Sequence, residues 1–412
     1  MVEVWLPYGK TDTHISIPLR DLLGTAEPVR GEPVANVVEE VQRSLKEPID
    51  SRTLDELVRR GVKIAVAVDG AMIPHLVVSA VYGIVQTLRQ VEVPLDDINI
   101  VVGNGLRGRS DPDLMKSIRA VEGFQSLRVV EHAPVGGNVT SIGTTTGGTE
   151  IIVNSAYVDS DLRIAVGDVR PDHFSGVKGA QSTILPSLSQ TASIERSRNR
   201  AFNVEIVPGY FEGNPIHDDE MEAARLAKTD LAVNLVTNGQ GELLKAYSGD
   251  LDASMREATT SLGESHRVRV EANADIIVVS AGGSRYDFDL YNSVWALEGI
   301  LPVARRGATI VLLSECTEGL GADGLETLAQ IDTLNELRRR YMLGARAVHL
   351  IKTALRTNEV ILVSALPGYL AEPLGLSVER TASEALRNLA QRRRGRRTQV
   401  VTHGCYNVPY VS

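Results

Sequence analysis

Short runs of apolar residues alternate along the chain with longer segments whose apolar positions recur at helical spacing. Residues 62–68 are apolar except for Lys63, which predicts a buried strand, and Pro74 opens a helix that we expect to reach Arg89. Further strands are predicted at 98–102, 127–131, 162–166, 231–236, 276–280, 309–313, 360–364 and 399–403. Further helices are predicted at 111–121, 218–227, 287–305, 324–342, 345–356 and 383–391. This order predicts an α/β fold with largely parallel sheets and helices on both faces.

Two stretches interrupt the alternation. Residues 167–215 are rich in Gly, Ser, Pro and Arg and have little periodicity, which in a compact chain is typical of a functional or a disordered segment. A polar stretch at 261–267 precedes the point where the alternation restarts. We therefore expect two α/β domains, residues 1–266 and 267–412.

Composition narrows the classes of function. With 43% hydrophobic and 23% charged residues the chain has the balance of a globular protein. A net charge of −9 and an aromatic content of 4% disfavour nucleic-acid binding. No apolar run reaches the ~18 residues of a membrane span, and the N-terminus lacks a signal-peptide pattern, so we expect a cytoplasmic protein without a membrane partner.

The cysteines and histidines do not have the spacing of a metal site. Cys316 and Cys405 are too few for a disulfide framework or a four-thiolate zinc site, and they suit a reducing compartment. The chain contains no HxxxH, HExxH or CxxC motif. The sequence therefore predicts no metal ligands.

Ligands of open parallel sheets bind beyond the carboxyl ends of the strands. Asp69 follows the first predicted strand, and the strand predicted at 162–166 is followed by Asp172 and His173, with Lys178 a few residues further on. A histidine beside a carboxylate is a common general acid or base, although a histidine in a loop is more often simply exposed. Asp172, His173 and Lys178 are therefore candidates for acid–base chemistry. His217 is instead expected to help cap the helix that follows it.

The loop after the strand at 98–102 contains Gly103, Gly105, Arg107 and Arg109. It lacks the GxGxxG spacing and the GK[ST] ending of nucleotide loops. Two interpretations remain open: Arg107 and Arg109 bind a substrate carboxylate as guanidinium forks, or the glycines form a tight turn and the arginines are solvated. The glycine-rich residues 143–148 are expected to form a hairpin turn.

The order of motifs along almost the whole chain resembles the nickel-pincer lactate racemase superfamily of 2-hydroxy-acid racemases and epimerases. The resemblance implies two α/β domains with the active site in the cleft between them. It is carried by Leu6-Pro7-Tyr8-Gly9, Asp69…Pro74, Gly103-Asn104-Gly105, Gly143-Thr144-Thr145…Gly148, Asp172 to Pro186, Gly213-Asn214-Pro215, Gly282-Gly283…Asp287…Leu290-Tyr291 and Ser314-Glu315-Cys316…Gly319…Gly321.

The cofactor positions of the family are altered here. The family tethers its nickel-pincer nucleotide through a lysine, and alignment on Ile184-Leu185-Pro186 places Ser182 at that position. The histidine that ligates nickel in the family falls on Arg198, and a guanidinium is not a metal ligand. Lys178 can serve as the tether only with a four-residue insertion before Ile184. The resemblance therefore implies a site without a tethered cofactor.

The family's catalytic and substrate-binding positions also differ. Its two catalytic histidines fall on Arg107 and Asp172, so that His173 is one residue displaced. Its Asp-x-x-Thr-Arg-Pro turn keeps Asp69 but has Met72 and Ile73 in place of Thr and Arg. Its Tyr-Gln-x-x-Lys motif retains the tyrosine, Tyr291, with Asn292 and Trp295 at the other two positions.

The first hypothesis is an enzyme of this fold that acts on a small hydroxy-acid or related carboxylate without the nickel pincer. Asp172, His173, Lys178 and Tyr291 would carry the acid–base chemistry. The substrate would be bound by Asp69, Arg107, Arg109, Ser182, Arg198, Asn292 and Trp295. Two alternatives remain: a pincer-dependent racemase or epimerase, and a non-catalytic paralogue that binds a carboxylate. The reaction could be an isomerisation by analogy, or a lyase or hydrolase step, and a homo-oligomer is left open.

Overall fold

The computed structural model describes residues 1–106, 112–392 and 396–411, and these form two compact α/β units. The central unit comprises residues 30–264, and the terminal unit combines residues 1–29 with residues 265–412. The expected first domain, 1–266, had included the N-terminal residues. In the structure they belong to the terminal unit, because strand β3 (Leu22–Ala26) pairs with β18 (Thr398–Val401) across most of the sequence.

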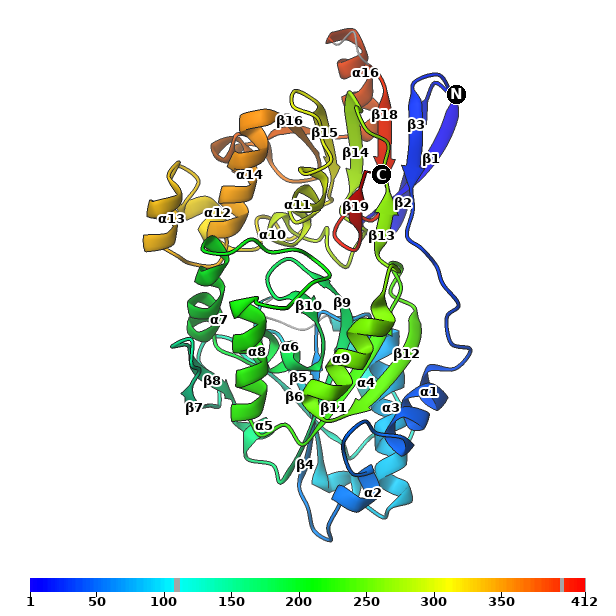
Figure 1. Ribbon diagram of the computed structural model, residues 1–412, viewed down its shortest axis with the longest axis vertical. Coiled ribbons are helices and arrows are strands. Elements are labelled where there is room, and N and C mark those ends of the chain that lie inside the picture. The colour runs from blue at the N-terminus through cyan, green and yellow to red at the C-terminus, as the bar shows by residue number, and fades with distance from the viewer. Residues whose placement is uncertain (107–111, 393–395, 412) are drawn as a thin grey trace. The chain divides into compact units, whose positions relative to one another are not determined.

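The sheet of the central unit has the strand order β12-β11-β9-β4-β5-β6 among the described residues (Figure 1). All neighbours are parallel except β11 and β12, which form an antiparallel pair that the sequence did not predict. The strands are β4 (Ile64–Asp69), β5 (Ile98–Gly103), β6 (Arg128–Glu131), β9 (Leu162–Asp172), β11 (Leu231–Thr237) and β12 (Leu243–Gly249), with β7 (Val139–Thr144) and β8 (Glu150–Asn154) in a separate hairpin. This hairpin confirms the turn expected at 143–148.

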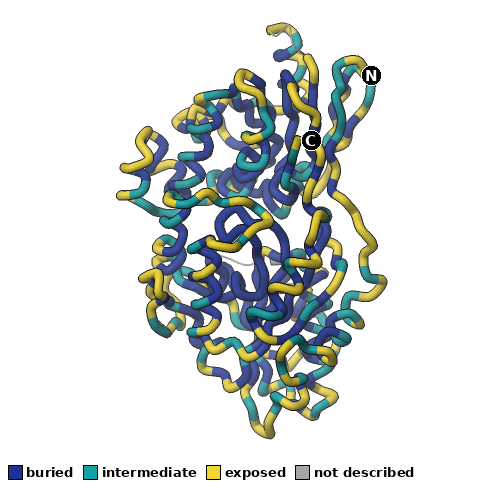
Figure 2. Tube along the Cα trace, in the orientation of Figure 1, coloured by how far each residue is buried: buried dark blue, intermediate teal, exposed yellow. Residues whose placement is uncertain are grey.

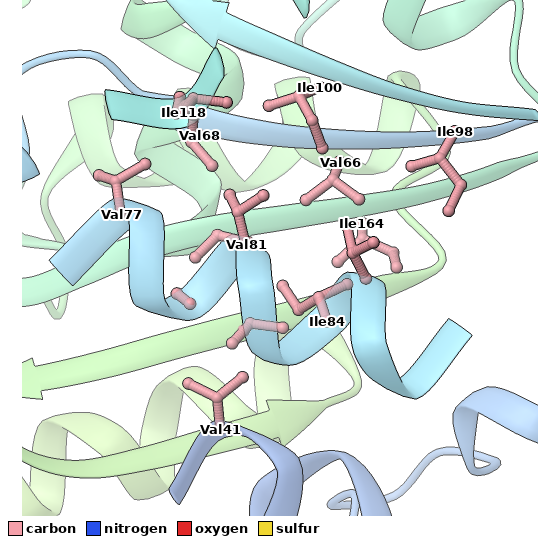
Figure 3. Packing of buried hydrophobic residues seen from close by; sticks show 14 of the residues in the cluster. Val41, Val66, Val68, Val77, Val81, Ile84, Ile98, Ile100, Ile118 and Ile164 are labelled. Atoms are coloured by element: carbon pink, nitrogen blue, oxygen red, sulfur yellow. The ribbon is translucent and has the colours of Figure 1, made fainter. Parts of the chain in front are cut away.

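Helices cover both faces of this sheet. On one face, Val77, Val81 and Ile84 of α3 pack against valines and isoleucines of β4, β5 and β9 (Figure 3). On the other, Met255 of α9 packs with Val169 and Val236. The helices are α1 (Val37–Lys46), α2 (Leu54–Leu57), α3 (Pro74–Gln90), α4 (Pro112–Arg119), α5 (Ser155–Val158), α6 (Ala180–Ser182), α7 (Thr191–Arg198), α8 (Pro215–Leu226) and α9 (Leu251–Leu262). The predicted doubly wound α/β arrangement is therefore confirmed for this unit.

The terminal unit contains a parallel sheet of order β17-β16-β15-β14-β18-β3. The N-terminal hairpin β1–β2 covers one face of it, where Val4, Leu6, Ile15 and Ile17 pack with Ile276 and its neighbours. The remaining strands are β1 (Val2–Tyr8), β2 (Thr11–Ile17), β13 (Arg267–Arg269), β14 (Ile276–Ser280), β15 (Thr309–Leu313), β16 (Glu359–Val363), β17 (Ser377–Glu379) and β19 (Val408–Tyr410). Its helices are α10 (Leu290–Ser293), α11 (Ala296–Ile300), α12 (Asp323–Thr327), α13 (Leu334–Arg339), α14 (Ala345–Thr357), α15 (Gly368–Ala371) and α16 (Ala382–Arg392).

One strand of the central unit differs from the sequence prediction in a way that places the candidate site. The strand predicted to end at Val166 continues as β9 to Asp172, where it pairs with the short antiparallel strand β10 (Gly176–Lys178). The neighbouring strand β4 stops pairing with β9 at Val166. The ribbon formed by β9 and β10 therefore extends beyond the carboxyl end of β4, and its residues 170–178 are all buried (Figure 2).

Candidate functional site

Charged residues alternate along the end of β9 and meet an opposing lysine from β10. Asp168, Arg170 and Asp172 are spaced two residues apart, so their side chains point to one side of the strand. Arg170 lies directly opposite Lys178 in the antiparallel register. Two cations at such a position repel each other, and carboxylates must offset the repulsion.

Two buried ion pairs provide that compensation. Asp168 accepts a hydrogen bond from Arg170 Nε at 2.9 Å, and Asp69, at the end of β4, pairs with Lys178 Nζ at 3.0 Å. All four side chains are less than one-tenth exposed. Removing one partner of such a pair leaves an uncompensated buried charge, so these residues are strongly coupled.

Asp172 is held as a carboxylate. Its Oδ1 accepts hydrogen bonds from the backbone amides of Phe174 and Ser175 at 2.8 and 2.9 Å, and one from the Ser175 hydroxyl. Burial by itself raises the pKa of Asp172, but the charges of Lys178, Arg198 and Arg170 outweigh it and hold the pKa well below its usual range. Asp172 is therefore ionised at neutral pH.

The carboxyl group of Glu220, unlike that of Asp172, has a raised pKa. It lies on α8 with 2% of its surface exposed, and Ser182 Oγ, at the end of α6, lies 2.6 Å from its Oε2. Burial and the nearby Asp172 carboxylate raise the pKa of Glu220 to about 8, although Ser182, Lys178 and Arg198 act in the other direction. A carboxylic acid that keeps its proton at neutral pH therefore lies beside one that does not.

Arg198 completes the group, which we call the charged cluster: Asp69, Asp168, Arg170, Asp172, Lys178, Ser182, Arg198 and Glu220. Arg198 ends α7, is 4% exposed, and lies with its guanidinium carbon 3.8 Å from the centre of the Phe174 ring. A guanidinium held against an aromatic face keeps a fixed orientation. Contact with the Phe174 ring thus fixes the direction of the Arg198 guanidinium next to the turn that follows Asp172.

The structure brings together five of the predicted site residues: Asp69, Asp172, Lys178, Ser182 and Arg198. His173, expected either as an acid–base group or as an exposed loop residue, is buried at 9% exposure directly after Asp172. Arg107 and Arg109 lie outside the described residues. Their predicted role in binding a carboxylate remains a prediction.

The glycines before Arg107 are explained by packing. A Cβ on Gly105 would lie 2.0 Å from the carbonyl oxygen of Pro186, and one on Gly103 would lie 2.7 Å from the backbone of Ser187. Gly105 also donates its amide hydrogen to the Ser187 carbonyl at 2.9 Å. Close approach of two backbones thus requires glycine at both positions.

Tyr291, Asn292 and Trp295 lie in the terminal unit. The side chain and backbone amide of Asn292 donate hydrogen bonds to Asp289 at the start of α10. The rings of Tyr291 and Trp295 meet edge to face at 5.6 Å, with both residues buried. These contacts give the three residues a packing and capping role within their own unit.

The prediction that His217 caps a helix is wrong. The helix α8 begins at Pro215, and the side chain of Asn214 accepts hydrogen bonds from the amides of Ile216 and His217. His217 is instead a buried residue of the first turn, stacked on Phe211 at 4.4 Å. Burial lowers its pKa to about 4, so the imidazole is neutral at physiological pH.

The glycine-threonine turn at 143–148 is bound to α8 by carboxylates. Both Thr145 and Thr149 donate hydroxyl hydrogen bonds to the buried Asp219, at 2.7 and 2.8 Å, and Arg200 pairs with the same side chain at 3.3 Å. Thr146 donates to Glu222 from its backbone amide. The turn therefore fixes α8, the helix that carries Glu220, rather than leaving its donors open for a phosphate.

Replacing Asp219 with Ala should lower the free energy of unfolding by about 3–5 kcal/mol, because two hydroxyls and the Arg200 guanidinium lose a buried acceptor. Urea unfolding followed by circular dichroism measures the change. The adjacent Asp218→Ala is the matched control and should stay within about 0.5 kcal/mol. Equal losses in the two variants would contradict this role of Asp219.

The residues at the family's cofactor positions do not fit a tethered nickel pincer. Ser182 offers a hydroxyl already shared with Glu220, and Arg198 cannot ligate a metal. Within the described ranges, no group of three or more His, Cys, Asp or Glu side chains is placed to hold a metal ion. The amine of the charged cluster, Lys178, is engaged by Asp69. We therefore derive no step that passes through this cofactor.

The chain is thus an α/β protein of two units, and the central unit holds a buried charged cluster that includes Asp69 and Asp172 at the carboxyl ends of β4 and β9. The family model of the lactate racemase N-terminal domain matches residues 8–206. Just under half of the chain is therefore similar to a domain of lactate racemases.

Curated relatives extend the similarity over most of the chain, and solved structures share its fold. Lactate racemases from Thermoanaerobacterium thermosaccharolyticum and Lactiplantibacillus plantarum are each 24% identical to the chain, over 352 and 344 residues respectively. Each match covers 82% of this chain. The matches cover 82% of the first relative and 80% of the second. The structure of the lactate racemase apoprotein from T. thermosaccharolyticum superposes with a TM-score of 0.83 at 21% identity, covering 99% of this chain and all of its own. A protein from Thermotoga maritima gives a TM-score of 0.71 at 12% identity, covering 93% of this chain and 100% of its own. Both structures show the same fold.

No helix in the described part of the chain is long and apolar enough to cross a membrane.

Proposed function

We propose that the protein is an isomerase that acts on a small 2-hydroxy carboxylate by acid–base chemistry in the charged cluster, without a tethered nickel pincer. The observation that carries this proposal is the burial of Asp172 and Glu220 in one group of charged side chains, where the neighbouring charges lower the pKa of Asp172 and burial raises that of Glu220. Environments that push two pKa values apart supply a base and an acid at the same pH. Similarity to lactate racemases supports an isomerisation as the reaction.

Each residue of the cluster has a role in this mechanism. Arg198 binds the substrate carboxylate, and its stacking on Phe174 fixes the direction of the guanidinium. Asp172 accepts the proton from the carbon next to the carboxylate. Glu220 donates its proton to the opposite face of the same carbon, which inverts it, and Ser182 orients the acid through its hydrogen bond. Proton exchange with solvent then restores the ionised Asp172 and the protonated Glu220. Burial excludes water and strengthens each of these interactions.

The alternative is a pincer-dependent racemase in which Lys178 bears the cofactor. Lys178 supports it because it is the amine of the charged cluster. Two residues argue against this alternative. Ser182 occupies the position of the tethering lysine and Arg198 that of the nickel-ligating histidine, and neither side chain can replace the one it aligns with.

Intact mass and nickel content separate the two mechanisms. The full-length chain is purified after co-expression with the enzymes that make the cofactor. Our proposal predicts the unmodified mass and no stoichiometric nickel. A mass excess that maps to Lys178, together with one nickel per chain, would contradict it. A lactate racemase prepared in parallel is the positive control for cofactor loading.

A further inference from the structure

The hairpin β1–β2 and the helix α16 leave a pocket of about 320 Å³ over the sheet of the terminal unit. Its walls come from the end of β2, the loop that follows β2, the first residues of β14 and β18, and α16. Pockets of roughly 300–1,000 Å³ are of the size that binds small molecules. The pocket lies at the amino ends of β14 and β18, so it belongs to a different unit of the chain from the charged cluster.

The inner wall of the pocket is apolar. Ile17 and Ile276 line it, and both belong to the buried core of the terminal unit. Leu386 of α16 packs against the same core and is half-buried at the pocket. Ala390 follows Leu386 by four positions and Arg387 by three, so that these side chains share one face of the helix. An alkyl chain bound here covers apolar surface that water would otherwise contact, which favours binding.

Two guanidinium groups line the same pocket, and neither forms an ion pair within the described ranges. Arg387 is exposed on α16. Arg396 donates a hydrogen bond to the carbonyl of Ala390 at 3.0 Å, which ties it to the end of the same helix and leaves further N–H donors of the guanidinium. Among the described lining residues Asp21 is the one carboxylate, and it lies 3.7 Å from Arg20. The lining therefore carries an excess of positive charge, which favours a monoanion.

We propose that this pocket is a binding site for a small alkyl carboxylate. The alkyl chain lies on Ile17, Ile276 and Leu386, and the carboxylate accepts hydrogen bonds from Arg387 and Arg396. A guanidinium can hold a carboxylate through two parallel N–H donors, which selects this anion over a neutral head group. No residue of the charged cluster takes part, and the ligand is not the 2-hydroxy acid of the proposed function. Either proposal can therefore fail while the other holds.

Calorimetric titration of the full-length chain with sodium octanoate, below the concentration at which it forms micelles, tests the proposal. We expect saturable binding of one octanoate per chain. Hexanoate should bind about 15-fold more weakly, because it buries two fewer CH₂ groups. Octylammonium has the same chain with the opposite charge, and acetate has the charge without the chain, so neither should bind in the same range. Equal affinities for octanoate and octylammonium would show that the arginines do not recognise the ligand, and the proposal would be wrong.

Variants of the lining locate the site. Arg387→Gln and Arg396→Gln should each weaken octanoate binding about 5-fold, since each removes one charge pair at the edge of the pocket. Ala390→Phe should abolish binding, because the ring fills the pocket while the backbone carbonyl can still accept from Arg396.

Arg392→Gln is the matched control for these variants. It removes a cation from the same helix outside the lining, where Arg392 pairs with Glu359, and it should leave binding unchanged. Circular dichroism should be the same for all four variants. Octanoate binding that survives Ala390→Phe, or that falls as much in Arg392→Gln as in Arg387→Gln, would overturn the proposal.

Discussion

Raising the pH from about 5 to 8 should lower the stability of the unmodified chain relative to Glu220→Gln, because groups that both chains share, such as His217, cancel in this comparison. The pKa of Glu220 is raised from 4.5 to about 8 in the folded chain. Between these values the unfolded chain has lost a proton that the folded chain still holds. The stabilisation is therefore complete below the unfolded pKa and is lost as the pH rises through the folded one.

The size of the effect follows from linkage. A difference of this size between the folded and unfolded pKa corresponds to about 4–5 kcal/mol across the window, which is a large part of the stability of a domain. Urea unfolding at a series of pH values measures it. Circular dichroism is the suitable probe, because both tryptophans, Trp5 and Trp295, are in the terminal unit.

Glu257→Gln is the matched control for this experiment. Glu257 is exposed on α9, which also belongs to the central unit, and its replacement should leave the pH dependence unchanged. If the difference in stability between the unmodified chain and Glu220→Gln stays constant over this pH range, then Glu220 does not hold a proton at neutral pH. The acid in the proposed mechanism would then have to be a different residue.

Asp172→Asn should reduce turnover of a 2-hydroxy acid by about 10²–10⁴-fold, the usual contribution of one acid–base group. The amide keeps the shape of the side chain and can still accept from the amides of Phe174 and Ser175. It cannot accept a proton from carbon. The loss should therefore appear in kcat more than in KM.

The same variant should also move the pH profile. The Asp172 carboxylate is one cause of the raised pKa of Glu220. Replacing that carboxylate with a neutral amide should therefore lower the pKa of Glu220, so that the turnover rate declines at a lower pH on the alkaline side of the profile. Asp230→Asn is the control, since Asp230 pairs with Arg163 outside the charged cluster. A rate unaffected by Asp172→Asn would show that the base lies elsewhere.

Most of the strands of the two main sheets could be predicted from apolar runs, because parallel strands covered on both faces are apolar on both sides. The end of β9 could not, since Gly167, Asp168, Arg170 and Pro171 interrupt the run after Val166. The signal that remained was the spacing of Asp168, Arg170 and Asp172, which is the period of a strand. The same segment had been expected to be irregular.

Glu220 was missed for a different reason. It is one of four acidic residues between 218 and 222, and composition alone marks such a run as a solvated helix face. Helical spacing offered a clue, because Ile216, Glu220 and Ala223 share one face and are all buried. Only the structure shows that this face meets Ser182 and that Glu220 is near Asp172.

Long-range strand pairing explains why the N-terminal segment lies in the terminal unit and not, as predicted, in the first domain. The residues of β1, β2 and β3 belong with the terminal unit because Thr25 and Ala26 pair with Val400 and Val401. Nothing in a local pattern indicates a partner so distant in the sequence. In the same unit, the helix predicted at 287–305 is two short helices, α10 and α11.

Exchange of the hydrogen on carbon 2 with solvent tests the central claim most directly. The unmodified, nickel-free chain is incubated in deuterium oxide with single enantiomers of lactate, glycerate and malate, and the products are followed by proton NMR. Acid–base isomerisation predicts that deuterium enters carbon 2 of the enantiomer that accumulates, and that Asp172→Asn stops it. Interconversion that retains the original hydrogen would mean that hydride, not a proton, is transferred, and would contradict the account.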